Sequence, residues 1–142
     1  MPSDFALKTM NSVHHVLLKV SGGKVGWTAG GMEALELHTT GRKSGQRRSS
    51  MLTSPITTDA GALVIVASKG GEPEHPAWFL NLQANPEVEV TRRGTTTPML
   101  ATVVGPDERP ALWAKVTAAQ KRYAGYQRKT EREIPLVVLT PR

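Results

Sequence analysis

The chain has 142 residues, 39% of them hydrophobic, and carries a formal net charge of +6 with no cysteine. The length predicts one domain with a core of its own, and the lack of cysteine excludes disulfides, thiolate nucleophiles, zinc fingers and iron–sulfur clusters. No segment reaches the roughly 20 apolar residues of a membrane span. The first residues also lack the continuous apolar run of a signal peptide, so we expect a cytoplasmic protein.

The positive charge is compatible with three kinds of partner: nucleic acid, an anionic membrane face, or a small polyanionic ligand. Aromatic residues make up only 5% of the chain, and no stripe of interleaved basic and aromatic side chains offers bases a surface for stacking. We therefore expect no nucleic-acid partner.

The N-terminal segment, residues 1–23, predicts a helix that ends at Gly22-Gly23. Its apolar positions fall on one helical face: Met10, Val13, Leu17 and Val20. Two interpretations stay open. The helix packs on the rest of the domain, or residues 1–20 form an amphipathic arm that contacts a membrane peripherally, which would place the protein at the inner face of the cell membrane.

Residues 34–142 predict short strands interrupted by two helices. The expected strands span residues 34–39, 49–58, 62–67, 88–91, 99–104 and 136–139, with a hairpin turn at Asp59-Ala60-Gly61. A short helix is expected from Pro76 to Asn85. A longer helix is expected from Pro106 to Gly125, its terminal turns matched to the helix dipole by Asp107 and Glu108, and by Lys121 and Arg122. This order favours an antiparallel barrel over a parallel βαβ sheet, hence an α+β, mainly β fold in one domain.

The loop of residues 40–49, with the sequence TGRKSGQRRS, carries the strongest chemical signal. It holds four cations, three hydroxyl side chains and two glycines, and no carboxylate occurs from Leu37 to Thr58. Glycines allow backbone N–H groups to turn towards an anion, while arginine and lysine supply charge over a longer reach. The loop therefore predicts a binding site for phosphate or carboxylate groups.

Three further segments offer polar or aromatic groups on loops and helix ends. Ser68-Lys69-Gly70-Gly71 follows a buried strand, His75 to Phe79 includes the ring of Trp78, and Tyr123 and Tyr126 lie at a predicted helix end. Each has an ordinary alternative: a solvated lysine, a core tryptophan, and tyrosines packed at an edge. Together with the basic loop they describe a groove for a polyanionic, partly aromatic ligand.

Several catalytic signatures are absent. The chain has no P-loop, no Rossmann glycine fingerprint, no H-E-x-x-H, no EF-hand loop and no G-x-S-x-G elbow. The four histidines are scattered, and we interpret His14, His15 and His38 as surface or structural residues. Hydrolase, kinase and metalloenzyme functions therefore have no supporting residues, and no metal site is expected.

Four segments, taken together, carry a more specific signal. They are residues 37–48 (LHTTGRKSGQRR), 66–69 (VASK), 76–86 (PAWFLNLQANP), and Tyr123 and Tyr126 followed by residues 132–135 (REIP). In combination they strongly resemble the deazaflavin-dependent nitroreductase family, the coenzyme F420-dependent reductases and quinone reductases of mycobacteria and their relatives. The resemblance extends from about Leu35 to the C-terminus.

The resemblance implies a split β-barrel over residues 34–142, like that of flavin-binding pyridoxamine-phosphate oxidases, preceded by the N-terminal helix. It also implies reduced F420, whose phosphate and polyglutamate tail would account for the basic loop. By resemblance, the cofactor-binding residues are Arg42, Lys43, Ser44, Arg48, Ser49, Ser50, Met51, Leu52, Thr53, Val66, Ala67, Ser68, Lys69, Ala77, Trp78, Phe79, Leu80, Asn81 and Tyr126. Trp78 and Tyr123 match positions on the substrate side, and Ser68 and Tyr123 are the candidate catalytic donors.

The function implied is hydride transfer from reduced F420 to quinones, activated enones such as coumarin-like lactones, or nitroaromatics. Two alternatives stay open: a non-catalytic carrier of F420, and a split barrel that binds FMN or heme. The chain departs from some family members at Ser50-Met51, where they have Asn-Pro. The small-molecule electron acceptor is the expected partner, and the chain is expected to be a monomer or a homodimer.

Overall fold

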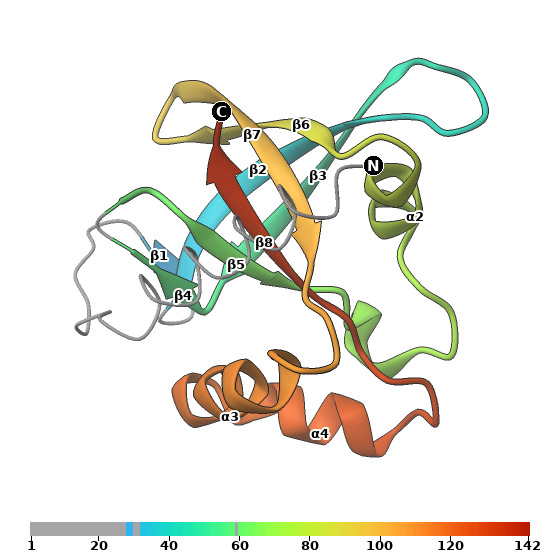
Figure 1. The fold of residues 1–142 in the computed structure, drawn as a ribbon, viewed down its shortest axis with the longest axis vertical. Coiled ribbons are helices and arrows are strands. Elements are labelled where there is room, and N and C mark those ends of the chain that lie inside the picture. Colours follow the sequence, from blue (N-terminus) through green and yellow to red (C-terminus); the bar gives the residue numbers. More distant parts are fainter. Residues whose placement is uncertain (1–27, 30–31, 59) are drawn as a thin grey trace.

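The computed structural model describes residues 28–29, 32–58 and 60–142 (Figure 1). The predicted N-terminal helix, its membrane contact, and Asp59 of the predicted hairpin turn lie outside the described residues. Within the part of the chain that is described, no helix is both long enough and apolar enough to cross a membrane.

The described strands form one curved antiparallel sheet. They are β1 (Thr28–Ala29), β2 (Met32–Thr40), β3 (Arg47–Ser54), β4 (Ile56–Thr57), β5 (Leu63–Val66), β6 (Glu87–Arg92), β7 (Thr95–Val103) and β8 (Leu136–Pro141). Their order is β1-β2-β6-β7-β8-β5-β4, with β3 paired to β2 off this path. Every pairing is antiparallel, which confirms the antiparallel prediction.

The sheet is open between β3 and β5. These strands approach each other, but no ladder joins them among the described residues. They are linked near one end by Ser54, whose Oγ lies 2.6 Å from the Val64 carbonyl oxygen and accepts a hydrogen bond from the Val64 N–H at 3.2 Å. A side chain thus bridges the opening at this end.

Two apolar clusters lie on the two faces of the sheet, and β5 contributes to both because successive strand residues point to opposite faces. Leu63 and Ile65 join the cluster that packs under α2 (Ala77–Ala84), whereas Val64 and Val66 join the cluster under α3 (Arg109–Ala119) and α4 (Arg122–Arg128). The complete burial of β5 agrees with the buried strand that the sequence predicts before Ser68.

The predicted helix from Pro106 to Gly125 is wrong, because the structure has two helices there. Gln120 takes an extended conformation with φ of −142° and ends α3, and α4 begins at Arg122. Gly125 lies inside α4 and does not stop a helix. The predicted match of the terminal charges to one helix dipole is wrong for the same reason: α3 has no acid in its first turn and no base in its last.

Two strand boundaries also differ from the prediction. The expected strand 49–58 is divided at Pro55, which has no N–H to donate to a ladder. β7 begins at Thr95 rather than Met99, because Arg93 and Gly94 both have positive φ and form a tight hairpin. The ladder between β6 and β7 therefore extends to this turn.

Gly71 fixes the position of the short 3-10 helix η1 (Lys69–Gly71) against α4. Its φ is +87°, and a Cβ there would lie 2.8 Å from the Tyr126 carbonyl oxygen and 2.9 Å from Lys129 Cβ. Any larger residue would have to push α4 away from η1, and α4 carries Tyr123 and Tyr126.

We predict that Gly71→Ala lowers the free energy of unfolding by about 1–3 kcal/mol through backbone strain, with a further loss from the collision with α4. Gly94→Ala is the matched control, since its φ is +83° and a Cβ there has nothing within 4 Å. Urea denaturation measures both. Equal losses in the two variants would show that the contact with α4 imposes no constraint.

Candidate active site

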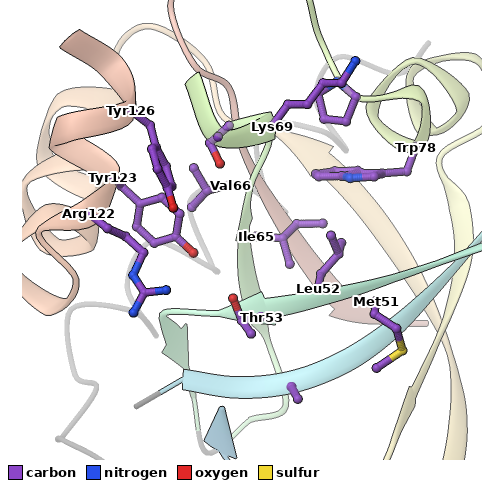
Figure 2. Close-up of a pocket in the computed structure, with 14 residues that line it drawn as sticks. Met51, Leu52, Thr53, Ile65, Val66, Lys69, Trp78, Arg122, Tyr123 and Tyr126 are labelled. Atoms are coloured by element: carbon purple, nitrogen blue, oxygen red, sulfur yellow. The ribbon is translucent and has the colours of Figure 1, made fainter. Parts of the chain in front are cut away.

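A cavity of ≈ 490 Å³ lies between β3, β5, α4 and the start of α2. Figure 2 shows the 14 residues that line it. They are Ala34, Met51, Leu52, Thr53, Ile65, Val66, Ser68, Lys69, Gly70, Pro76, Trp78, Arg122, Tyr123 and Tyr126. The cavity therefore occupies the opening that the sheet leaves between β3 and β5.

The walls of this cavity are aromatic and its base is aliphatic. Trp78 lies across from Tyr123 and Tyr126, and Leu52 and Ile65 lie between them (Figure 2). The two tyrosine rings meet edge to face, with centroids 5.9 Å apart. A space bounded by rings on opposite sides and by aliphatic groups between them suits a flat, partly apolar ligand.

The charged groups that line this cavity are both cations, Lys69 and Arg122. Lys69 has a partner, because its Nζ donates to Glu74 Oε1 at 3.0 Å. For Arg122 no carboxylate partner is found among the described residues. With no acid among its 14 lining residues, the cavity favours ligands that offer negative charge or acceptor oxygens.

Tyr123 places a neutral hydroxyl at the cavity wall. The residue is 5% exposed, its Oη lies 3.4 Å from Met32 Sδ, and it hydrogen-bonds the Thr53 side chain. Burial raises the pKa of Tyr123, while the Thr53 hydrogen bond and the charge of Arg122 act in the opposite direction. The phenol therefore stays protonated at neutral pH and can donate a hydrogen bond.

Arg132 holds the segment that carries Ser68 and Lys69. Its guanidinium donates to the carbonyl oxygens of Ala67 at 3.1 Å, Ser68 at 2.8 Å and Glu72 at 2.9 Å. Desolvation by burial lowers the pKa of Arg132, and the pKa of His75 is lowered first by burial and then by the charge of Arg132. The sequence analysis gave Arg132 no structural role, since its partners lie about sixty residues away in the chain.

A second cavity of ≈ 260 Å³ adjoins the first. It is lined by Thr39, Gly41, Arg42, Lys43, Ser44, Arg48, Ser50, Ala77, Trp78 and Asn81. Trp78 is a wall of both cavities. A single ligand could therefore place one end among the cations of the loop and the other between the aromatic walls.

The basic loop is held closed on itself and tied to α2. The Gly41 N–H donates to the Gln46 carbonyl oxygen at 2.7 Å, and the Gly45 N–H donates to the Gly41 carbonyl oxygen at 2.8 Å. Buried Asn81 accepts from the Arg42 N–H at 3.1 Å and from Arg42 Nη1 at 2.9 Å, and donates to Thr39 Oγ1 at 3.2 Å. Asn81 thus orients Arg42 at the second cavity.

The four loop cations do not face the same way. Arg47 pairs with Glu89 on β6 and lines a separate cavity of ≈ 180 Å³ with His38. Although no carboxylate occurs from Leu37 to Thr58, Arg47 is therefore neutralised by one that is distant in sequence. His38 is confirmed as a satisfied structural histidine, because its ring nitrogens lie 2.7 Å from Ser49 Oγ and 2.8 Å from Thr91 Oγ1.

Sixteen of the twenty predicted site residues line one or both cavities. The second cavity holds Arg42, Lys43, Ser44, Arg48, Ser50, Ala77 and Asn81; the first holds Met51, Leu52, Thr53, Val66, Ser68, Lys69, Tyr123 and Tyr126; Trp78 lines both. The remaining four, Ser49, Ala67, Phe79 and Leu80, line neither. Ser49 bonds His38 instead, and the other three pack within or against the core.

Arg122 is a charged lining residue whose role the sequence analysis missed. It was assigned to the end of one long helix, whereas the break at Gln120 places it in the first turn of α4. There it shares a helical face with Tyr126, four residues on. The four-residue spacing from Arg122 to Tyr126 could have indicated a shared face. It does so only if a new helix is known to begin near residue 121.

Comparison with known proteins identifies the family. The family model for F420H(2)-dependent quinone reductase matches residues 10–141. The F420H(2)-dependent quinone reductase Rv1261c of Mycobacterium tuberculosis is 40% identical over 134 residues, which cover 92% of this chain and 89% of that protein. The chain belongs to the F420H(2)-dependent quinone reductase family.

Solved structures agree with this assignment. An F420-H2 dependent reductase (FDR-A) is 35% identical, with a TM-score of 0.66 over 82% of this chain and 99% of that one. A domain-swapped dimer is 31% identical, with a TM-score of 0.67 over 98% of this chain and 99% of that one. A pyridoxamine 5'-phosphate oxidase-related, FMN-binding protein from Nostoc punctiforme, 13% identical with a TM-score of 0.54 over 99% of this chain and 81% of that one, shares the fold alone.

The predicted family and split-barrel fold are therefore confirmed. As a family member the chain is an oxidoreductase with reduced coenzyme F420 as its cofactor. The residues present fit such a group: a cavity rich in cations for phosphate and carboxylates adjoins one with aromatic walls for a flat ring system.

We predict that Tyr123 ionises above the ordinary tyrosine pKa of about 10, because burial disfavours the phenolate. The chain contains two tyrosines, so Tyr126→Phe leaves Tyr123 as the single titrating phenol. Its near-ultraviolet absorbance should rise at a higher pH in the folded variant than in denaturant. Folding stability should accordingly fall as pH rises from about 10 towards the folded pKa. Coincident titrations would contradict the assigned burial.

Proposed function

We propose that this enzyme reduces quinones, and also activated enones and nitroaromatics, with hydride from reduced F420. One observation carries the proposal: Trp78 is a wall of two cavities, one lined by loop cations that pair with no carboxylate among the described residues, the other holding a neutral, buried phenol. The name of the mycobacterial relative supports the quinone. The other two acceptor classes follow from shared chemistry, because each gains negative charge on an oxygen when hydride adds to it.

The loop would hold the acidic part of the coenzyme. Arg42, Lys43 and Arg48 line the second cavity together with Ser44, and no carboxylate among the described residues pairs with these cations. Charge-assisted hydrogen bonds from such groups to phosphate and carboxylate oxygens are short and strong. Asn81 supports this arrangement by fixing Arg42.

The larger cavity would hold the ring system and the acceptor. Residues 51–53 on β3, residue 66 at the end of β5, residues 68–69 after that strand, and Tyr126 on α4 supply walls along which the deazaflavin would lie. When bound, the reduced coenzyme supplies one hydride, which is two electrons and a proton; one further proton from solvent then converts a quinone to its hydroquinone. Trp78 would bound the acceptor on the side towards α2.

Tyr123 and Ser68 would stabilise the charge that develops on the acceptor oxygen. Both line the larger cavity, and Tyr123 is held protonated by its burial. Donors that are already oriented towards a developing oxyanion lower the barrier without reorganisation. Arg132 keeps Ser68 in place through its backbone carbonyl.

We predict that Lys43→Ala weakens F420 binding by about tenfold or more, since a hydrogen bond to a charged group contributes roughly 1.5–3 kcal/mol. Affinity should also depend less on salt in this variant. Arg47→Ala is the matched control: it removes the same charge from the same loop, but from the side that faces Glu89. Calorimetric titration at two ionic strengths measures both. Unchanged affinity in Lys43→Ala would remove Lys43 from the site.

We predict that the wild-type protein oxidises reduced F420 in the presence of menadione, and that Tyr123→Phe slows turnover roughly ten- to hundredfold. Coenzyme affinity should stay within a factor of about two, because the phenol acts on the acceptor. Absorbance of oxidised F420 follows turnover, and calorimetry gives the affinity. Binding without turnover in the wild type would indicate a carrier. Loss of affinity alone in Tyr123→Phe would show that the phenol holds the coenzyme.

A further inference from the structure

Arg122 is a cation at the wall of the larger cavity. It lies in the first turn of α4 beside Tyr123, with its guanidinium on the tyrosine side of the cavity, across from Trp78 and Lys69 (Figure 2). Its side chain is exposed, so a ligand entering from solvent can reach it.

The charge of Arg122 is not neutralised by the described part of the chain. No carboxylate lines the cavity, and the other cation there, Lys69, already has Glu74 as its partner. Its influence is visible on Tyr123, whose pKa its charge tends to lower. The five N–H donors of the guanidinium suit bidentate contact with a carboxylate or sulfonate.

Arg122 lies away from the cations that are proposed to bind the phosphate and carboxylates of the coenzyme. The cations Arg42, Lys43 and Arg48 line the second cavity, which shares the wall residue Trp78 with the larger one. Arg122 is at the opposite end of the larger cavity from Trp78, and it does not line the second cavity. A further anion-binding group is thus available at the end where Tyr123 stands.

We propose that Arg122 determines acceptor specificity, by favouring acceptors that carry a carboxylate or sulfonate beside the ring that receives hydride. This inference rests on the proposed function, since it assumes that the acceptor binds in the larger cavity. A bidentate pair between a guanidinium and an anion is stronger than an ordinary exposed salt bridge, although solvent at this wall screens part of it, so we expect about a tenfold preference over a neutral acceptor of similar size.

Equilibrium binding tests the assignment without turnover. Naphthoate and the neutral naphthamide are titrated into the protein saturated with oxidised F420. Arg122→Gln should weaken naphthoate binding about tenfold and leave naphthamide unchanged, whereas Arg122→Lys should restore part of the loss. Arg128→Gln is the matched control, because Arg128 is an exposed cation of the same helix that lines neither cavity.

Kinetics provide the second measurement. The ratio of kcat/KM for a naphthoquinone sulfonate to kcat/KM for menadione should fall about tenfold in Arg122→Gln and hold in Arg128→Gln. An unchanged ratio together with unchanged naphthoate binding overturns the proposal, as does a loss confined to F420 affinity. If neither quinone is reduced, the proposed function fails, and naphthoate binding alone still decides whether Arg122 recognises the anion.

Discussion

The opening between β3 and β5 is the constraint on which the site depends. A closed ladder there would fill the space that now forms the larger cavity, and the sheet keeps it open while Ser54 bridges the two strands near one end. The apolar faces that remain are covered by α2 on one side and by α3 and α4 on the other. These helices also bring Trp78 and the two tyrosines to the cavity, so the packing that stabilises the open sheet builds the binding site.

Contacts between residues that are distant in sequence decide which cations near this opening keep their charge free for a ligand. The loop holds four cations within seven residues, yet Glu89 pairs Arg47 on one side of β2 while Asn81 fixes Arg42 on the other. Asn81 can orient an arginine without neutralising it, because an amide oxygen accepts hydrogen bonds but carries no net charge. Positive charge is therefore retained at the second cavity, where an acidic ligand would need it.

Much of the fold could be predicted from local patterns, because alternating apolar residues, Pro and Gly specify strands and turns directly. The anion-binding loop was recognised from its own composition, whereas most of the individual site residues were implied by the resemblance to the family. The misses share a cause. The break at Gln120, the pairing of Arg47 with Glu89 and the contacts of Arg132 with residues 67–72 all depend on tertiary packing. An apolar period that continues from α3 into α4 conceals the break, since both helices cover the same cluster.

Tyr123 shows how a residue packed in the core can also present a hydrogen-bond donor to a ligand. Its ring belongs to the cluster under α3 and α4, and placing a hydroxyl in such surroundings is unfavourable unless it finds a partner. Here Thr53 supplies a hydrogen bond and the cavity supplies access to a ligand. The burial that makes the phenolate unfavourable also keeps the neutral donor in one orientation, because the ring is packed against Tyr126. A donor held in this way loses little further freedom when it meets an acceptor oxygen, so stability and reactivity at this position have a common origin.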